Sequence, residues 1–154
     1  MRLHVRNFFL AGLVQLLAAG VAAAQDNSWI DIPIYGNWCG PNHPENMSRA
    51  APPVDALDAA CMRHDQCTAA RGRFDCGCDI GLLQELRATH WPNPVIGRNA
   101  RAIYDAIAMV PCTSPDGMAV KQSMFTADLM RDVMTGQGTP MDVLDRWRRL
   151  APVP

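Results

Sequence analysis

The sequence predicts a mainly α-helical domain stapled by disulfide bonds, and three observations support this fold class. Most of the chain after residue 53 consists of runs of good helix formers with apolar residues three or four apart, which is the spacing of one helix face. No convincing alternating stretch longer than about four residues predicts a strand. Six cysteines, all after residue 38, are an even number in a chain whose first residues have the pattern of an export signal. Exported chains commonly pair their cysteines.

The first residues predict a secretory signal peptide over residues 1–24. Arg2 and Arg6 give a positively charged start, an apolar stretch covers residues 8–19, and three alanines at 22–24 offer a cleavage site. The apolar run is too short to span a bilayer, which takes about 20 residues. An amphipathic or anchoring helix is the alternative interpretation. We therefore expect a secreted or periplasmic protein without a transmembrane segment after signal removal, and one domain over residues 25–154.

The remaining elements follow in order along the chain. Residues 29–53 are rich in Gly, Pro and Asn and predict an extended loop. Helices are predicted over residues 56–70, 74–86, 98–109, 118–134 and 141–150. Asp55 is the expected cap of the first helix and Gly72 its end. Residues 113–154 are a helical C-terminal extension to which the sequence assigns no role.

The charge balance excludes one class of partner. The chain has 14 Lys and Arg residues against 15 Asp and Glu residues. Domains that bind nucleic acid usually carry a strongly basic surface. We therefore expect no nucleic-acid partner.

The cysteines leave two interpretations open, and the residues alone do not determine how they pair. The first is three disulfides. The second is a zinc site made of Cys76, Cys78 and a histidine. Zinc sites usually place two to four residues between their thiolates, whereas one residue separates Cys76 from Cys78. Disulfides are therefore favoured.

Residues 58–67 concentrate the candidate chemistry. Cys61 and Cys67 flank His64 and Asp65, and residues three or four apart are neighbours on a helix. The ordinary alternative is a polar pair on a solvated helix surface. A site is favoured because crosslinks would hold the pair, and because carbonyls of the upstream loop plus one carboxylate are a suitable donor set for Ca²⁺. An imidazole beside such a cation can take a proton from water while the cation polarises an ester.

Three segments together are similar to the secreted, calcium-dependent phospholipases A2. Residues 38–42 (Trp-Cys-Gly-Pro-Asn) resemble the calcium loop of that family, residues 58–67 match its active-site helix, and residues 75–79 (Asp-Cys-Gly-Cys-Asp) resemble the segment that carries its second catalytic aspartate. The three segments span residues 35–79, and no pattern of the family is found beyond Cys112. The resemblance implies a phospholipase A2-like fold with a calcium loop and two core helices that carry the active site. It also implies a monomer that acts on phospholipid aggregates or a membrane surface.

The resemblance implies a role for each matching residue. His64 would be the base that activates water for attack on the sn-2 ester, and Asp79 would orient His64. Asp65 would bind Ca²⁺, which would stabilise the oxyanion. The other protein ligands of the cation would be the backbone carbonyls of Trp38, Gly40 and Asn42.

The resemblance also implies the disulfide pairing, and it is closest to the bee-venom-like branch of the family. In that branch a tyrosine eight residues before the last cysteine supports the catalytic aspartate. Tyr104 is therefore expected either to donate to Asp79 or to pack at a helix edge. Asn42 stands where the family usually has glycine, so we expect a positive φ there, which asparagine tolerates. The implied pairs are Cys39–Cys61, Cys67–Cys78 and Cys76–Cys112.

Two alternatives to an enzyme remain. One is a non-catalytic relative that binds a membrane or a protein on the same scaffold. Such relatives commonly lose a catalytic residue, whereas His64, Asp65 and Asp79 are all present. The other is a stapled inhibitor or toxin of unrelated fold, which would leave the match of three segments to coincidence. The sequence favours the enzyme.

Overall fold

Helices account for most of the chain that the structure describes, which is residues 31–150, with side chains described as far as residue 145. This computed structural model contains a short 3₁₀ helix, η2 (Met47–Arg49), and the α-helices α2 (Ala56–Arg71), α3 (Cys76–Ala88), α4 (Pro94–Met109), α5 (Pro115–Met134) and α6 (Pro140–Leu150). In the same range there is no strand, only an isolated bridge between Tyr35 and Cys39. The predicted mainly α-helical fold is confirmed. The signal peptide expected over residues 1–24 lies outside the described residues.

The ends of α2 and the start of α3 follow from local chemistry. The Asp55 carboxylate accepts from the first N–H groups of α2, and Gly72, with φ of +107°, ends that helix. The next helix begins at Cys76, two residues later than predicted. Phe74 has φ of +61° and cannot be helical, and Asp75 takes the cap position by accepting from the Cys78 N–H.

Two helices begin three or four residues earlier than the sequence predicted because a proline starts each of them. Asn93 caps α4 and Pro94 occupies its first position. Ser114 and Pro115 do the same for α5. Proline is favoured at the first helical position because its missing N–H needs no partner there. Pro94 and Pro115 are therefore helix starts.

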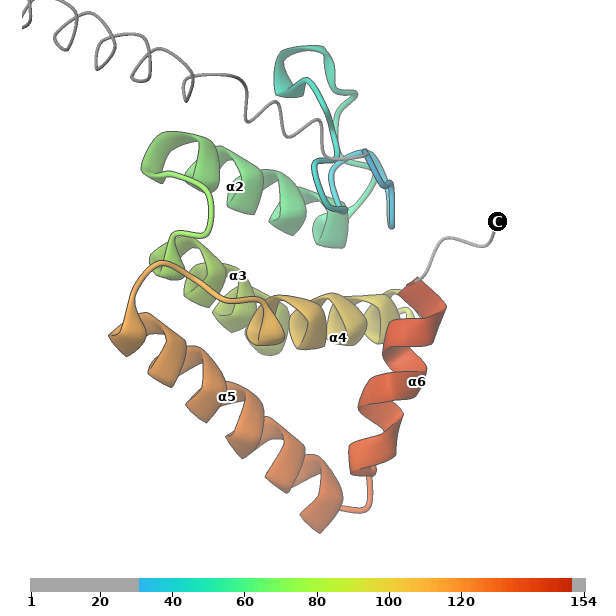
Figure 1. Cartoon of the computed structure of the whole chain (residues 1–154). Helices are drawn as coiled ribbons and strands as arrows, with labels where there is room; N and C mark the ends of the chain where they lie inside the picture. Colours follow the sequence, from blue (N-terminus) through green and yellow to red (C-terminus); the bar gives the residue numbers. More distant parts are fainter. Residues whose placement is uncertain (1–30, 151–154) are drawn as a thin grey trace, which may run out of the picture.

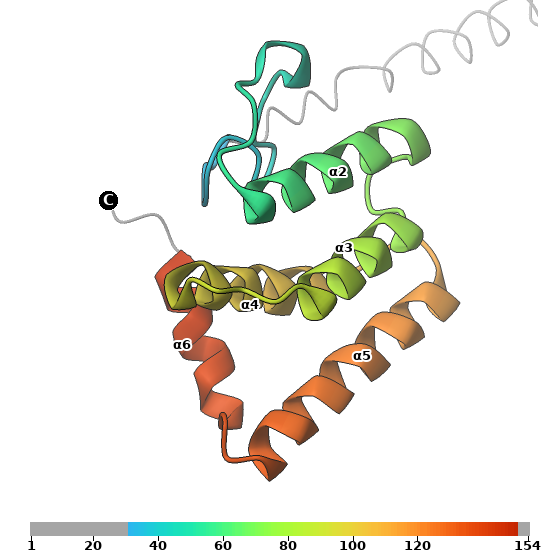
Figure 2. The same ribbon diagram turned by 180° about the vertical axis from the view of Figure 1, so that it is seen from behind.

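The central helix is α3 (Figures 1 and 2). It lies beside α4 in the middle layer, with α2 on one side and with α5 and α6 on the other. The core lies where α2, α3 and α4 meet, and Leu57 and Leu83 are fully buried in it. Burial of a side chain of this size contributes about 1.5–3 kcal/mol. Among the described helices, none combines the length and apolar character needed to cross a bilayer.

Three disulfides tie the layers together, in the pairing that the resemblance implied. One joins the N-terminal loop to α2, the second joins α2 to α3, and the third joins α3 to the segment before α5. They are Cys39–Cys61, Cys67–Cys78 and Cys76–Cys112. Because Cys76 and Cys78 are both crosslinked, the zinc interpretation is wrong.

Candidate active site

His64 and Asp79 form a hydrogen-bonded pair between α2 and α3. The Nε2 atom of His64 lies 2.9 Å from Oδ1 of Asp79. Only 15% of the His64 side chain and 6% of the Asp79 side chain are exposed. Since a carboxylate can only accept, the proton of a neutral imidazole is assigned to Nε2 and the lone pair to Nδ1. Nδ1 is therefore the nitrogen that can take a proton.

The Cys67–Cys78 disulfide brings this pair together. Cys67 lies three residues after His64, and Cys78 directly precedes Asp79. The Cα atoms of Cys67 and Cys78 are 5.7 Å apart. In the other two disulfides the Cα atoms are 5.1 Å apart. The crosslink therefore holds the turn of α2 that carries the imidazole beside the first turn of α3.

The second oxygen of Asp79 contacts Lys121 of α5. The Lys121 Nζ atom lies 2.5 Å from Asp79 Oδ2 and 2.7 Å from the carbonyl oxygen of Val110, which caps the end of α4. Lys121 is fully buried. The sequence motifs did not indicate Lys121 as part of the site. Its one signal is that it is the only lysine among 14 basic residues.

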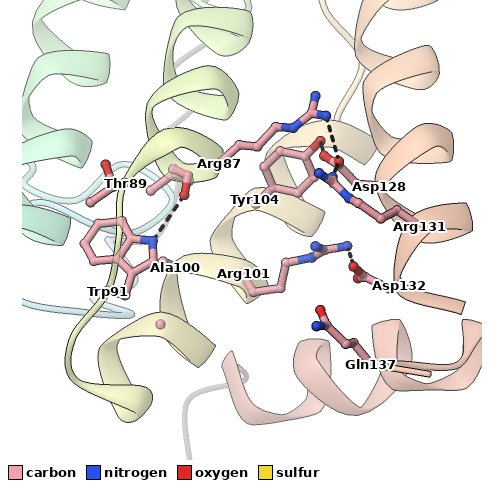
Figure 3. Close-up of a pocket in the computed structure, with 12 residues that line it drawn as sticks. Arg87, Thr89, Trp91, Ala100, Arg101, Tyr104, Asp128, Arg131, Asp132 and Gln137 are labelled. Atoms are coloured by element: carbon pink, nitrogen blue, oxygen red, sulfur yellow. Dashed lines mark hydrogen bonds and ion pairs between the residues drawn. The ribbon is translucent and has the colours of Figure 1, made fainter. Parts of the chain in front are cut away.

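The expected hydrogen bond from Tyr104 to Asp79 is wrong. The Tyr104 hydroxyl donates instead to Asp128 Oδ2 of α5, at 2.5 Å, and a phenol has only one proton to donate. Tyr104 and Asp128 lie side by side (Figure 3) in the wall of a cavity of about 320 Å³ between α3, α4 and α5, and neither His64 nor Asp79 lines this cavity. Lys121 occupies the place at Asp79 that the resemblance implied for Tyr104.

Each arginine that lines the cavity next to Tyr104 pairs with an aspartate of the same wall. Arg87 lies 3.2 Å from Asp128, and Arg131 also pairs with Asp128. Arg101 lies 2.8 Å from Asp132. The three cationic side chains labelled in Figure 3 therefore have carboxylate partners, and we assign no ligand to the cavity.

Asp65 lies beside His64 with one carboxylate oxygen unpaired. Its Oδ1 atom is 3.8 Å from Nδ1 of His64, which is the distance of an ion pair rather than a hydrogen bond. Among the described residues, its buried Oδ2 atom has no hydrogen-bond partner. Burial raises the pKa of Asp65, against the opposing effects of His64 and His43. A cation bound to this oxygen would relieve the cost of burying it.

The two neighbouring carboxylates shift the titration of His64. Burial disfavours the charged imidazolium, but the contacts and charges of Asp65 and Asp79 outweigh burial and raise the pKa of His64 to about 9. In the protein without a cation, His64 therefore holds its proton more tightly than an ordinary histidine.

Asp58 fixes the predicted calcium loop against α2. This carboxylate is fully buried and accepts from the backbone N–H groups of Asn37, Trp38 and Val54 at 2.8–2.9 Å. The Cys39–Cys61 disulfide adds a covalent tie to α2, four residues before Asp65. The loop is thus held at the helix that carries the candidate cation ligand.

At three loop positions the residue type matches the local backbone: two have no room for a Cβ, and the third has a positive φ. Gly36 has φ of +60°, and a Cβ there would lie 2.3 Å from Asp58 Cγ. At Gly40, a Cβ would lie 2.0 Å from the carbonyl oxygen of Ile32. The positive φ expected at Asn42 is confirmed, at +55°. The Asn42 side chain also accepts a hydrogen bond from Arg73 in the α2–α3 turn, a contact that glycine could not make.

The donor chemistry of this region suits Ca²⁺. The described residues contain no cluster of three or more His, Cys, Asp and Glu side chains that could hold a metal, so a cation here would need backbone oxygens beside Asp65. The Gly40 carbonyl accepts from the His43 N–H at 3.2 Å, and its second lone pair remains for a ligand. One unpaired carboxylate oxygen with loop carbonyls is a set of hard oxygen donors. The expected carbonyls are those of Trp38, Gly40 and Asn42.

Comparison of the chain with protein-family models, with curated proteins and with solved structures finds no match in any of the three. The family resemblance therefore rests on the segments at residues 38–42, 58–67 and 75–79.

Proposed function

We propose that this protein is an exported, calcium-dependent phospholipase A2. It hydrolyses the sn-2 acyl ester of glycerophospholipids in aggregates or membranes and releases a fatty acid and a lysophospholipid. The observation that carries the proposal is the 2.9 Å contact between His64 Nε2 and Asp79 Oδ1. It is supported by the unpaired Asp65 oxygen on the next residue.

His64 acts as the base in this proposal. Its Nδ1 atom takes a proton from a water molecule as the water oxygen bonds to the carbonyl carbon of the sn-2 ester. Asp79 keeps the reactive tautomer in place and stabilises the imidazolium. When the bond between that carbon and the glycerol oxygen breaks, His64 returns the proton to the leaving oxygen.

Asp65 and the carbonyls of Trp38, Gly40 and Asn42 are the residues that would hold Ca²⁺. When bound there, Ca²⁺ would supply positive charge that stabilises the oxyanion as it develops. With Asp65 paired to a cation, less of its negative charge would act on His64. The pKa of His64 should therefore fall from about 9 towards neutral pH, where a base is most effective.

The test is hydrolysis of a phospholipid labelled at sn-2, measured with Ca²⁺ and with a chelator. We expect activity to vanish with the chelator and in His64→Gln. His90→Gln is the matched control, because His90 is an exposed histidine outside the site. Activity that survives the chelator or His64→Gln would refute the mechanism. Vesicle binding without hydrolysis in the wild type would favour the non-catalytic alternative.

Asp65→Lys separates the cation site from the base. We expect calorimetry to detect no Ca²⁺ binding, because the lysine places its own positive charge at the unpaired oxygen position. The three disulfides should keep the domain folded, which circular dichroism can verify. Ca²⁺ affinity equal to that of the wild type would exclude Asp65 as a ligand.

Export is part of the same proposal. The expected cleavage after residue 24 gives a mature chain that begins at Gln25. Mass spectrometry of protein recovered from the periplasm or the medium measures this start directly. An exported form that retains residues 1–24 would refute the signal peptide.

A further inference from the structure

We propose that Lys121 is a positioning residue of the candidate active site, which holds Asp79 in the orientation that bonds His64. The inference rests on the proposed function for its catalytic consequence, and on geometry for the contact itself. It gives the C-terminal extension a role: α5 supplies the third member of a chain of contacts that runs from His64 through Asp79 to Lys121.

Burial of the lysine is costly unless its charge is compensated. Transfer of an ammonium group from water to the protein interior is strongly unfavourable even after the protein relaxes. Lys121 is 0% exposed, and its described partners are the Asp79 carboxylate and the Val110 carbonyl. Val110 caps the C-terminus of α4, where the helix dipole favours a positive charge. An apolar side chain would fill the same space without the desolvation cost, so packing alone does not explain a lysine here.

The two oxygens of Asp79 are divided between two partners. Oδ1 lies 2.9 Å from His64 Nε2, and Oδ2 lies 2.5 Å from Lys121 Nζ. A carboxylate held at both oxygens cannot rotate about its Cβ–Cγ bond without breaking one of the contacts. Lys121 therefore fixes the plane in which Asp79 presents Oδ1 to the imidazole.

Lys121 also compensates the charge of Asp79 while His64 is neutral. Only 4% of Asp79 is exposed, and a buried carboxylate without a cationic partner is strongly disfavoured. The neutral imidazole that the mechanism requires offers a hydrogen bond but no charge. The ammonium group supplies this charge throughout the reaction, so Asp79 does not depend on a protonated His64.

The position of Lys121 is itself fixed by the third disulfide. The Cys76–Cys112 bond ties the start of α3 to the segment before α5. The Thr113 N–H donates to the Phe74 carbonyl in the same region, at 2.9 Å. The lysine therefore approaches Asp79 from a helix that is anchored next to the first turn of α3.

The contact can be tested by NMR on protein labelled with ¹⁵N at the lysine Nζ. The wild type should give one signal, because Lys121 is the only lysine. We expect this signal to shift in Asp79→Asn. We also expect Lys121 of the native protein to resist reductive methylation and to react once the chain is unfolded. Methylation of native Lys121 at the rate of an exposed amine would overturn the inference.

The positioning role is tested with Lys121→Met, which keeps the length of the side chain and removes its charge. We expect the downfield His64 Nε2–H resonance to be lost and kcat to fall by about 10- to 100-fold, with KM within about twofold of the wild type. Gln122→Met is the matched control, because Gln122 is the exposed neighbour on α5. A folded Lys121→Met protein with the wild-type resonance and kcat would overturn the inference.

The outcomes separate this inference from the proposed function. Wild-type protein without hydrolytic activity, but with both NMR responses, would refute the function and retain the positioning contact. An active wild-type enzyme whose Lys121→Met variant keeps the wild-type kcat and His64 resonance would support the function and refute the positioning role. If Lys121→Met does not fold, the Nζ signal decides, because an unchanged signal in Asp79→Asn refutes the contact.

Discussion

Replacement of Asp58 by alanine should destabilise the protein by about 4–5 kcal/mol. The substitution removes the acceptor of three backbone N–H groups, those of Asn37, Trp38 and Val54. A hydrogen bond to a charged group contributes about 1.5–3 kcal/mol. The Trp38 N–H is buried, so the loss of its acceptor should cost about 2–3 kcal/mol of stability. Water can reach the part-buried N–H groups of Asn37 and Val54, so the loss of their acceptor should cost about 1 kcal/mol each.

Two further variants make this estimate specific. Asp58→Asn keeps one acceptor oxygen and should lose about half as much. Asp116→Ala is the matched control, because Asp116 is an exposed aspartate in the first turn of α5, as Asp58 is a buried one in the first turn of α2. The helix dipole alone predicts a loss below about 1 kcal/mol for Asp116→Ala.

The assay is guanidinium unfolding with the disulfides intact, followed by tryptophan fluorescence. Trp38 is buried beside Asp58 and should report directly on the loop. The stability difference is read from the midpoint at constant slope. An Asp58→Ala protein within about 1 kcal/mol of the wild type would show that the three hydrogen bonds do not hold the loop, and would refute the reasoning.

Three other predictions concern stability. In chelator-treated protein, the free energy of unfolding should fall by about 3 kcal/mol as pH rises from 6.5 to 9. Folding raises the pKa of His64 from 6.5 to about 9, so protonated His64 stabilises the fold fully below pH 6.5 and no longer does so above pH 9. His64→Gln should abolish this dependence on pH. Gly81→Ala should raise the free energy of unfolding by about 0.5–1 kcal/mol, because Gly81 is helical and a Cβ there meets nothing within 4 Å; a loss of stability in denaturant unfolding would contradict this. Removal of the Cys76–Cys112 bond by paired Cys→Ala changes should cost about 4 kcal/mol for a loop of this length, measured by thermal unfolding, and an unchanged Tm would contradict the estimate.

The helices were predictable because their signals are local. Asp55 caps α2 and Gly72 ends it, as the sequence indicated, and both effects act within a few residues. The errors were local too. Phe74 takes a positive φ that delays α3, and Pro94 starts α4 four residues before the predicted start at residue 98.

The site was predictable only in part because its contacts join distant segments. The His64–Asp79 pair was expected from the resemblance, as was the disulfide pairing, which the residues alone left open. The partners of Tyr104 and Lys121 lie 24 and 42 residues away, and helical periodicity carries no information on such contacts. A lysine and a tyrosine can each donate to a carboxylate, so only the packing of α4 and α5 on α3 decides which of them reaches Asp79.

The separation of 42 residues between Lys121 and Asp79 also has a consequence in time. Synthesis begins at the N-terminus, so His64 and Asp79 have been made before α5. At that stage the two side chains can meet while the second oxygen of Asp79 has only water as a partner. A product of early termination or proteolysis that ends after residue 79 and before residue 121 keeps His64 and Asp79 but never acquires Lys121. Such fragments would contain all three family-like segments and still lack the ammonium group that completes the native arrangement, so the length of the chain matters to the site as much as its motifs do.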